Sequence, residues 1–168
     1  TGCSSIWGGS APSTPYTKNA EGKGPAWANS LFEDNAEYGY GMFLGQEAIR
    51  NSYIAKVKDV AENGTNPVAV DAANKYLETV NDGEANAVAT RELVEALTSC
   101  DCDKAKAILK GKNYLAKKSV WAFGGDGWAY DIGYGGLDHV IASGEDVNIL
   151  VFDTEVYSNT GGQASKAT

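Results

Sequence analysis

The sequence predicts an α/β fold, with a parallel sheet near its C-terminal end and a block of helices in its middle. Two apolar runs, at residues 119–123 and 147–153, have the length and composition of strands. One helix-length stretch, at about residues 130–143, separates them, as in a βαβ unit. Apolar residues spaced by threes and fours fill the centre of the chain, which is typical of packed helices.

The elements follow in order along the chain. Turn signals such as Gly22-Lys23-Gly24-Pro25 indicate that residues 1–30 form a loop. Helices are predicted at about 36–62, from Pro67 to residue 80, at about 84–97 and at about 101–114, with Asn63-Gly64 and Asn81-Asp82-Gly83 as stop signals. We therefore divide one partial domain into a loop (1–30), a helical block (31–116) and a βαβ unit (117–168).

Neither predicted strand alternates between polar and apolar residues, which is expected of parallel strands buried on both faces. Two strands are too few for a stable sheet, so further strands are expected from flanking sequence or from residues 1–30. The first residue is Thr1 rather than Met, and neither end carries helix caps. We interpret the chain as a truncated piece of a longer one.

Composition excludes several classes of function. The formal net charge of −8 argues against nucleic acid as a partner. No apolar run approaches 18 residues, so no membrane span is predicted, and no signal peptide is expected in this sequence. Three cysteines without a regular framework favour a reducing, cytoplasmic setting. The single histidine, His139, is interpreted as a structural residue on the apolar side of its helix.

Polar residues follow both predicted strands. Gly125-Asp126-Gly127 comes after the first strand, and Asp153-Thr154 comes after the second. Ligands bind at the carboxyl edge of parallel sheets, where glycines let backbone N–H groups approach a phosphate. Asp126 repels a phosphate, so we expect it to bind a bridging Mg²⁺, with oxygens from Thr154 and the Val156 carbonyl. The alternative is a simple β-turn, since Asp-Gly is common in turns.

The spacing of Gly125-Asp126-Gly127 and Asn159 resembles the signature of thiamine diphosphate enzymes. Within that class, residues 124–140 (GGDGWAYDIGYGGLDHV) and 153–168 (DTEVYSNTGGQASKAT) resemble pyruvate:ferredoxin (flavodoxin) oxidoreductases. Residues 1–17 (TGCSSIWGGSAPSTPYT) and 27–42 (WANSLFEDNAEYGYGM) resemble the same family. The implied fold is a truncated thiamine diphosphate-binding fold, a Rossmann-like parallel sheet with helices on both faces.

The resemblance implies a role for each matching residue. It makes Asp126, Thr154 and Val156 the Mg²⁺ ligands and places Asn159, the candidate catalytic residue, near the reacting end of the cofactor. It makes Cys3 a ligand of a [4Fe-4S] cluster, and gives Cys100 and Cys102 no counterpart, so these two are interpreted as ordinary thiols at a helix junction. The full set of expected cofactor contacts is Thr1, Gly2, Cys3, Ser4, Gly125, Asp126, Gly127, Trp128, Thr154, Val156 and Asn159.

The implied parent is an enzyme that oxidises pyruvate with coenzyme A to acetyl-CoA and CO₂, and passes the electrons to ferredoxin or flavodoxin. Other domains of the same chain and a homodimer are implied as well. The paired cluster cysteines and the glutamate that activates the cofactor are missing from this sequence, so we expect the fragment alone to be inactive and to lack the cluster. A non-redox thiamine diphosphate enzyme and a non-catalytic Rossmann-like binding domain remain as alternatives.

Overall fold

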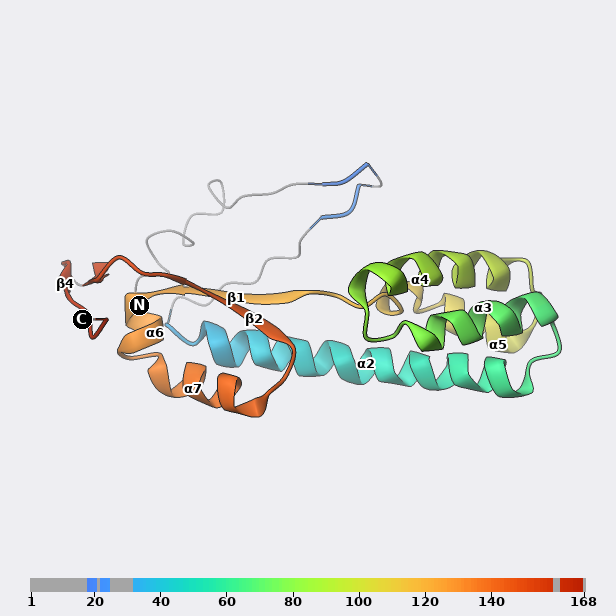
Figure 1. Cartoon of the computed structure of the whole chain (residues 1–168), viewed down its shortest axis with the longest axis horizontal. Coiled ribbons are helices and arrows are strands. Elements are labelled where there is room, and N and C mark those ends of the chain that lie inside the picture. The colour runs from blue at the N-terminus through green and yellow to red at the C-terminus, as the bar shows by residue number, and fades with distance from the viewer. Residues whose placement is uncertain (1–17, 21, 25–31, 159–160, 168) are drawn as a thin grey trace. The chain divides into compact units, whose positions relative to one another are not determined.

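The computed structural model describes residues 18–20, 22–24, 32–158 and 161–167 (Figure 1). The chain divides into two compact units. Unit 1 comprises Thr1–Phe43 and Val120–Thr168, and unit 2 comprises Leu44–Ser119. Helix α2 (Asn35–Asn63) contributes its first turns to unit 1 and the rest to unit 2.

Unit 2 is helical, and its helix starts follow from the sequence. After α2 come α3 (Pro67–Glu78), α4 (Gly83–Thr98), α5 (Asp103–Leu109) and a 3₁₀ turn, η2 (Lys112–Tyr114). The side chain of Asn66 accepts hydrogen bonds from the first backbone N–H groups of α3, and Asp82 does the same for α4. Pro67 occupies the first turn of α3, where its missing N–H costs nothing.

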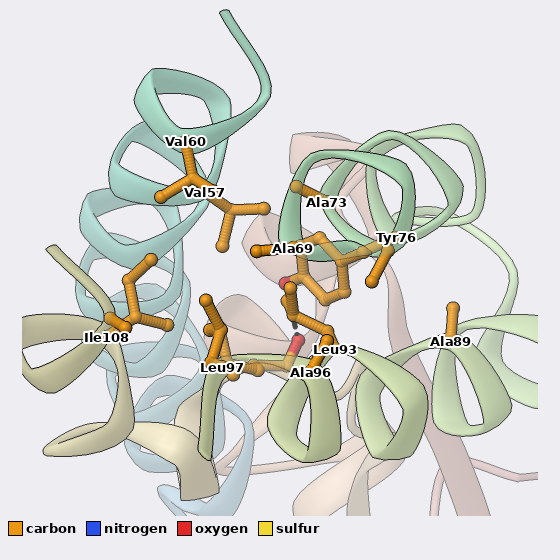
Figure 2. Close-up of a cluster of buried hydrophobic side chains, with 13 residues drawn as sticks. Val57, Val60, Ala69, Ala73, Tyr76, Ala89, Leu93, Ala96, Leu97 and Ile108 are labelled. Carbon is orange, nitrogen blue, oxygen red and sulfur yellow. Dashed lines mark hydrogen bonds between the residues drawn. The ribbon is translucent and has the colours of Figure 1, made fainter. Parts of the chain in front are cut away.

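The core of unit 2 lies where these helices face one another (Figure 2). Its fully buried side chains include Val57 from α2, Tyr76 from α3, Leu93 and Leu97 from α4, and Ile108 from α5. Small alanines between them, such as Ala69, Ala73 and Ala105, let the helices approach closely. This confirms the predicted helical block, although its fourth helix ends at Leu109 and continues only as the 3₁₀ turn.

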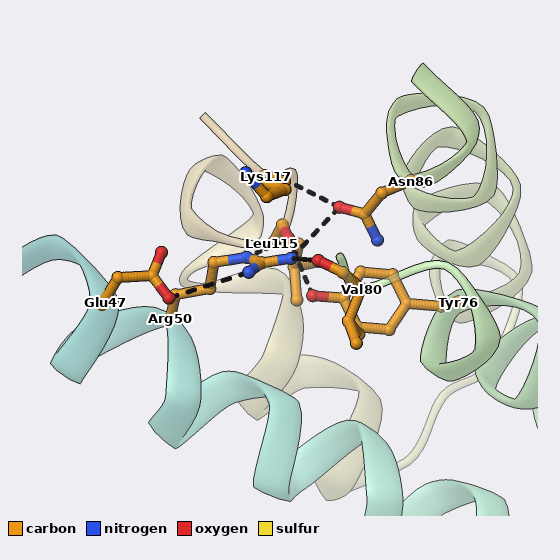
Figure 3. Close-up of polar contacts among 7 residues, drawn as sticks. All are labelled: Glu47, Arg50, Tyr76, Val80, Asn86, Leu115 and Lys117. Carbon is orange, nitrogen blue, oxygen red and sulfur yellow. Dashed lines mark hydrogen bonds and ion pairs between the residues drawn. The ribbon is translucent and has the colours of Figure 1, made fainter. Parts of the chain in front are cut away.

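A buried arginine joins the polar groups inside unit 2 (Figure 3). The guanidinium of Arg50 donates to the Leu115 carbonyl (3.2 Å), the Val80 carbonyl (2.7 Å) and Asn86 Oδ1 (3.4 Å). The Tyr76 hydroxyl also donates to the Leu115 carbonyl, at 2.7 Å. Burial raises the pKa of Tyr76, so this phenol remains a hydrogen-bond donor. The Arg50 guanidinium thus provides hydrogen bonds to the Leu115 and Val80 carbonyls, which lie outside the helices.

Unit 1 contains the predicted βαβ unit. Strand β1 (Val120–Gly125) pairs in parallel with β2 (Val147–Phe152), and Gly125 lies opposite Phe152. Between them run α6 (Asp126–Tyr130) and α7 (Tyr134–Ser143). The chain then folds into an antiparallel pair, β3 (Val156–Tyr157) and β4 (Gln163–Ala164). Among the described residues of this unit, Trp128 is the largest buried side chain, and it packs with Ala122, Leu137 and Val140.

Several local predictions are wrong in detail. The linking helix begins at Tyr134 rather than Tyr130, because α6 precedes it as a separate helix. His139 is exposed, and Ile141 on the predicted apolar side of α7 is 62% exposed. The strands are not buried on both faces, since Leu150 and Phe152 are 41% and 43% exposed. Each strand has one neighbour within the described residues, so little covers these side chains.

Among the described residues, no helix is both long and apolar enough to cross a bilayer.

Candidate functional site

The parallel pairing of β1 and β2 brings the ends of both strands to one edge of the sheet. Asp126 follows β1 directly, and Thr154 lies two residues beyond the end of β2. The backbone N–H of Thr154 donates to Asp126 Oδ1 at 2.8 Å, across 28 residues of sequence. The expected meeting of these two residues at the sheet edge is therefore confirmed.

The carboxylate of Asp126 is fully buried at the start of α6. Its Oδ1 accepts a second hydrogen bond from Thr154 Oγ1 at 3.3 Å, and its Oδ2 accepts one from Ser165 Oγ at 3.0 Å. Hydrogen bonds of this kind offset the cost of burying a carboxylate. The negative charge of Asp126 is thus held in a defined orientation by groups that reach it from beyond β2.

Three oxygens of different chemistry lie close together at this edge, and one of them belongs to Asp126. Thr154 Oγ1 lies 3.3 Å from Asp126 Oδ1 and 3.4 Å from the Val156 carbonyl oxygen. Neighbouring ligands of an octahedral Mg²⁺ site with bonds of about 2.1 Å lie roughly 3.0 Å apart. The observed separations are close to that value. A carboxylate, a hydroxyl and a carbonyl form a hard oxygen set, so these residues fit Mg²⁺.

The described residues contain no cluster of three or more His, Cys, Asp or Glu side chains that could hold a metal. A site made entirely of charged or sulfur ligands, such as a structural zinc site, is therefore not present in this part of the chain. One carboxylate with two neutral oxygens suits a cation that takes its remaining ligands from phosphate and water.

The backbone between Thr154 and Val156 is bent in an unusual way. Glu155 has φ of 63°, in the left-handed region that non-glycine residues rarely adopt. This residue turns the chain so that the Thr154 hydroxyl and the Val156 carbonyl lie on the same side. The carbonyl of Glu155 accepts a hydrogen bond from the Ser165 backbone N–H at 3.2 Å, which holds the bend. Backbone strain of this kind is found most often at binding sites.

The glycines and the tryptophan beside Asp126 are closely packed. A Cβ on Gly127 would lie 2.5 Å from the ring of Tyr157, so a side chain there would force β3 away from α6. A Cβ on Gly124 would overlap the ring of Trp128. Trp128 is fully buried, and its Nε1–H has no hydrogen-bond partner among the described residues. Gly125, Gly127 and Trp128 therefore lie at the site, and their contact with a cofactor stays a prediction.

Sequence reasoning missed two residues near the site. Ser165 is buried and reaches Asp126 because the β3–β4 pair folds the chain back. The Tyr130 hydroxyl donates to Asp153 Oδ2 at 3.2 Å. Desolvation, and then Asp153, raise the pKa of Tyr130, so the phenol stays protonated. The sequence feature that could have predicted the turn between β3 and β4 is Gly161-Gly162, since both glycines have positive φ.

Five predicted site residues, namely Thr1, Gly2, Cys3, Ser4 and Asn159, lie outside the described residues. Of the predicted set, the structure brings together Asp126, Thr154 and Val156.

The chain is similar to known proteins along its whole length. Residues 105–168 match the model of the family described as thiamine pyrophosphate enzyme, C-terminal TPP binding domain. The whole chain is 54% identical over 174 residues to pyruvate-flavodoxin oxidoreductase from Klebsiella pneumoniae. It is 51% identical over 179 residues to pyruvate:ferredoxin oxidoreductase from Moorella thermoacetica. The chain belongs to the pyruvate:ferredoxin (flavodoxin) oxidoreductase family.

The match to this family covers 100% of the chain but 14% of the Klebsiella protein and 15% of the Moorella protein. A further relative, pyruvate dehydrogenase [NADP(+)] from Cryptosporidium parvum, is 43% identical over 205 residues, and the chain spans 11% of it. In all three relatives the chain thus corresponds to one segment of a much longer protein. The truncated α/β thiamine diphosphate-binding fold predicted from the sequence is confirmed.

Replacement of Ser165 by alanine is expected to destabilise the chain by about 1–3 kcal/mol, because Asp126 Oδ2 is buried and loses its donor. The midpoint of urea-induced unfolding measures this. The matched control is Ser52→Ala, which removes an exposed hydroxyl that bonds locally to the Ile49 carbonyl. That control should shift stability by less than about 0.5 kcal/mol. Equal effects of the two substitutions would show that Ser165 does not support Asp126.

Proposed function

We propose that this chain forms the Mg²⁺–diphosphate end of a thiamine diphosphate site in a larger enzyme that oxidatively decarboxylates pyruvate with coenzyme A. The enzyme would produce acetyl-CoA and CO₂ and pass electrons to ferredoxin or flavodoxin. The observation that carries the proposal is the convergence of Asp126 Oδ1, Thr154 Oγ1 and the Val156 carbonyl at the edge of a parallel sheet. The names of the relatives supply the substrate and the electron acceptors.

In this proposal, each residue has a separate task. Asp126 contributes the one full negative charge to the metal, and its burial keeps competing water away from the carboxylate. Thr154 is exposed, so the oxygen cluster opens toward solvent on that side, where a diphosphate can approach. The buried Gly125 and Gly127 place backbone beside Asp126 without side chains in the way. Bound thiamine diphosphate would supply the electron sink that decarboxylation requires.

The remaining roles rest on the family resemblance. Thr1, Gly2 and Ser4 would lie beside the diphosphate, and Asn159 would lie near the reacting end of the cofactor. Cys3 would ligate a [4Fe-4S] cluster together with cysteines from elsewhere in the parent chain. Trp128 would direct toward the ligand its indole N–H, which has no hydrogen-bond partner among the described residues. A buried donor without a partner costs free energy, so a ligand acceptor at that position would be favourable.

The parent would be a cytoplasmic homodimer in which other domains of the same chain complete the site. The chain spans 11–15% of relatives that are named for flavodoxin, ferredoxin and NADP⁺. A segment common to proteins with such different acceptors would serve the shared pyruvate chemistry, and other domains would select the acceptor. We accordingly propose that the isolated chain has no activity.

A non-redox thiamine diphosphate enzyme is the alternative, and the oxidoreductase names of the relatives count against it. The two hypotheses predict different effects of the substitution Cys3→Ser. In an oxidoreductase, Cys3→Ser would slow electron transfer to the acceptor more than it weakens cofactor binding. In a non-redox enzyme, the same substitution would leave turnover nearly unchanged.

The proposed function is tested by pyruvate- and coenzyme A-dependent reduction of a viologen dye by the intact parent enzyme. Thr154→Val removes one neutral metal ligand, which water can replace, so the dissociation constant of thiamine diphosphate should rise only about tenfold, about 1.4 kcal/mol. Thr154→Ser keeps the hydroxyl and should bind the cofactor almost as the parent does. The absence of pyruvate-dependent reduction in the parent, or equal affinities in both variants, would contradict the proposal.

A further inference from the structure

Two cysteines lie together on the segment that joins α4 to α5 in unit 2. Cys100 follows the end of α4 and Cys102 precedes the first residue of α5. The thiol of Cys100 donates a hydrogen bond to Cys102 Sγ, with 3.0 Å between the two sulfur atoms. A disulfide bond measures about 2.0 Å, so an approach of about 1 Å would bring the two sulfurs to bonding distance. The pair is thus close to a cross-link without being one.

The two thiols differ in environment. Cys102 is exposed, whereas Cys100 is half-buried and packs against the core of unit 2. The hydrogen bond from Cys100, followed by the nearby backbone N–H of Ala105, lowers the pKa of Cys102. The same bond and desolvation raise the pKa of Cys100. Because the thiolate is the nucleophile in thiol chemistry, Cys102 is suited to react first with a reagent in solution, and Cys100 to react second.

We propose that Cys100 and Cys102 form a redox-active dithiol that small disulfides convert reversibly into an intrachain disulfide. In this role the two residues would be more than the ordinary helix-junction thiols that the sequence indicates. It rests on the sulfur–sulfur contact and on the exposure of Cys102, and it does not depend on the cofactor site of unit 1.

The reaction balances with a small disulfide as the oxidant. The Cys102 thiolate attacks one sulfur of the small disulfide, whose S–S bond breaks and releases one small thiol. The Cys100 thiol then loses its proton to solvent, and its sulfur attacks Cys102 Sγ and expels the second small thiol. Two electrons and two protons pass from the pair to the oxidant. An excess of dithiol reductant reverses both steps.

A stable metal site is a weaker explanation of the pair. No third His, Cys, Asp or Glu joins the two thiols in a metal-binding cluster anywhere in the described part of the chain. Structural zinc sites require four ligands, and these two cysteines supply half of them.

The test uses the 168-residue chain with Cys3→Ser, so that the pair supplies its only thiols. Oxidised glutathione is added to the reduced protein, and the intact mass is recorded before and after. We expect a mass loss of about 2 Da, no retained glutathione, and the disappearance of both titratable thiols. Dithiothreitol should restore both thiols. The change should not depend on protein concentration, since the bond forms within one chain.

Single substitutions assign the order of the steps. With Cys3→Ser and Cys100→Ser, Cys102 should accumulate as a stable mixed disulfide with glutathione. With Cys3→Ser and Cys102→Ser, modification of Cys100 should be slower by about tenfold or more, because Cys100 is half-buried whereas Cys102 is exposed.

Phenylarsine oxide, which needs two adjacent thiols, provides a second measurement on the reduced pair. It should bind one equivalent to the Cys3→Ser chain and none to either double variant. A glutathione adduct that persists on the Cys3→Ser chain, or two thiols that survive the oxidant, would overturn the proposal. Failure of the arsenical to bind the reduced chain would also overturn it.

Discussion

Asp126→Ala in the intact enzyme is expected to weaken Mg²⁺-dependent binding of thiamine diphosphate by on the order of a hundredfold, about 2.7 kcal/mol. The substitution removes the only full negative charge assigned to the metal, and a carboxylate is the ligand that water replaces least well. The structure adds a second consequence. Thr154 and Ser165 both donate to this carboxylate, so they lose the acceptor that orients them.

Asp126→Asn is the matched control for that loss of orientation. The amide oxygen can still accept from the Thr154 N–H, while the full charge is gone. If Asp126 acts as a metal ligand, Asn should lose most of the affinity even though the sheet edge stays intact. If Asp126 only supports the fold, Asn should restore binding. Titration calorimetry with and without Mg²⁺ measures both variants, and parent-like affinity in Asp126→Ala would exclude the metal role.

Arg50→Ala is expected to destabilise unit 2 by about 3 kcal/mol. The side chain is buried and donates to the carbonyls of Leu115 and Val80 and to Asn86. Alanine removes these donors, leaves the Val80 carbonyl short of a partner and opens a cavity. Leu115 keeps one bond, from the Tyr76 hydroxyl, which limits the loss. Chemical denaturation of the 168-residue chain measures the free energy of unfolding.

Two controls separate the bonding network of Arg50 from general effects of removing a cation. Arg50→Lys keeps the charge but offers a compact head that cannot reach three acceptors in a fork, so it should recover only part of the stability. Arg91→Ala removes an exposed arginine from α4 and should cost less than about 0.5 kcal/mol. A loss in Arg50→Ala no larger than in Arg91→Ala would show that the network contributes nothing.

Local sequence signals predicted the elements that local physics determines. Pro67 predicted the start of α3, and Asn81-Asp82-Gly83 predicted the break between α3 and α4. The structure adds that Asn66 and Asp82 cap the two helices. The apolar runs predicted β1 and β2, and their parallel pairing follows from the helices between them. That pairing placed Asp126 beside Thr154, so the centre of the candidate site could be predicted before any coordinates.

Contacts between distant residues were not predictable in this way. Ser165 bonds to Asp126 across 39 residues, and Arg50 bonds to Leu115 across 65. No periodicity marks such partners, because each depends on how whole elements pack. The short helix α6 was also missed, since its glycine-containing sequence has low helix propensity. Close packing stabilises α6 instead: the ring of Trp128 lies against Gly124, and the ring of Tyr157 lies against Gly127.

In the proposed site, Asp126, Thr154 and Val156 hold the cation that binds the diphosphate. The most direct measurement is a crystal structure of the intact enzyme with thiamine diphosphate and Mn²⁺ in place of Mg²⁺, with the metal located by its anomalous scattering. We predict one Mn²⁺ at about 2.2 Å from an Asp126 carboxylate oxygen, Thr154 Oγ1 and the Val156 carbonyl, with diphosphate oxygens and water in the remaining positions. A metal bound to the diphosphate but not to Asp126, with that carboxylate still accepting from Thr154 and Ser165, would contradict the account.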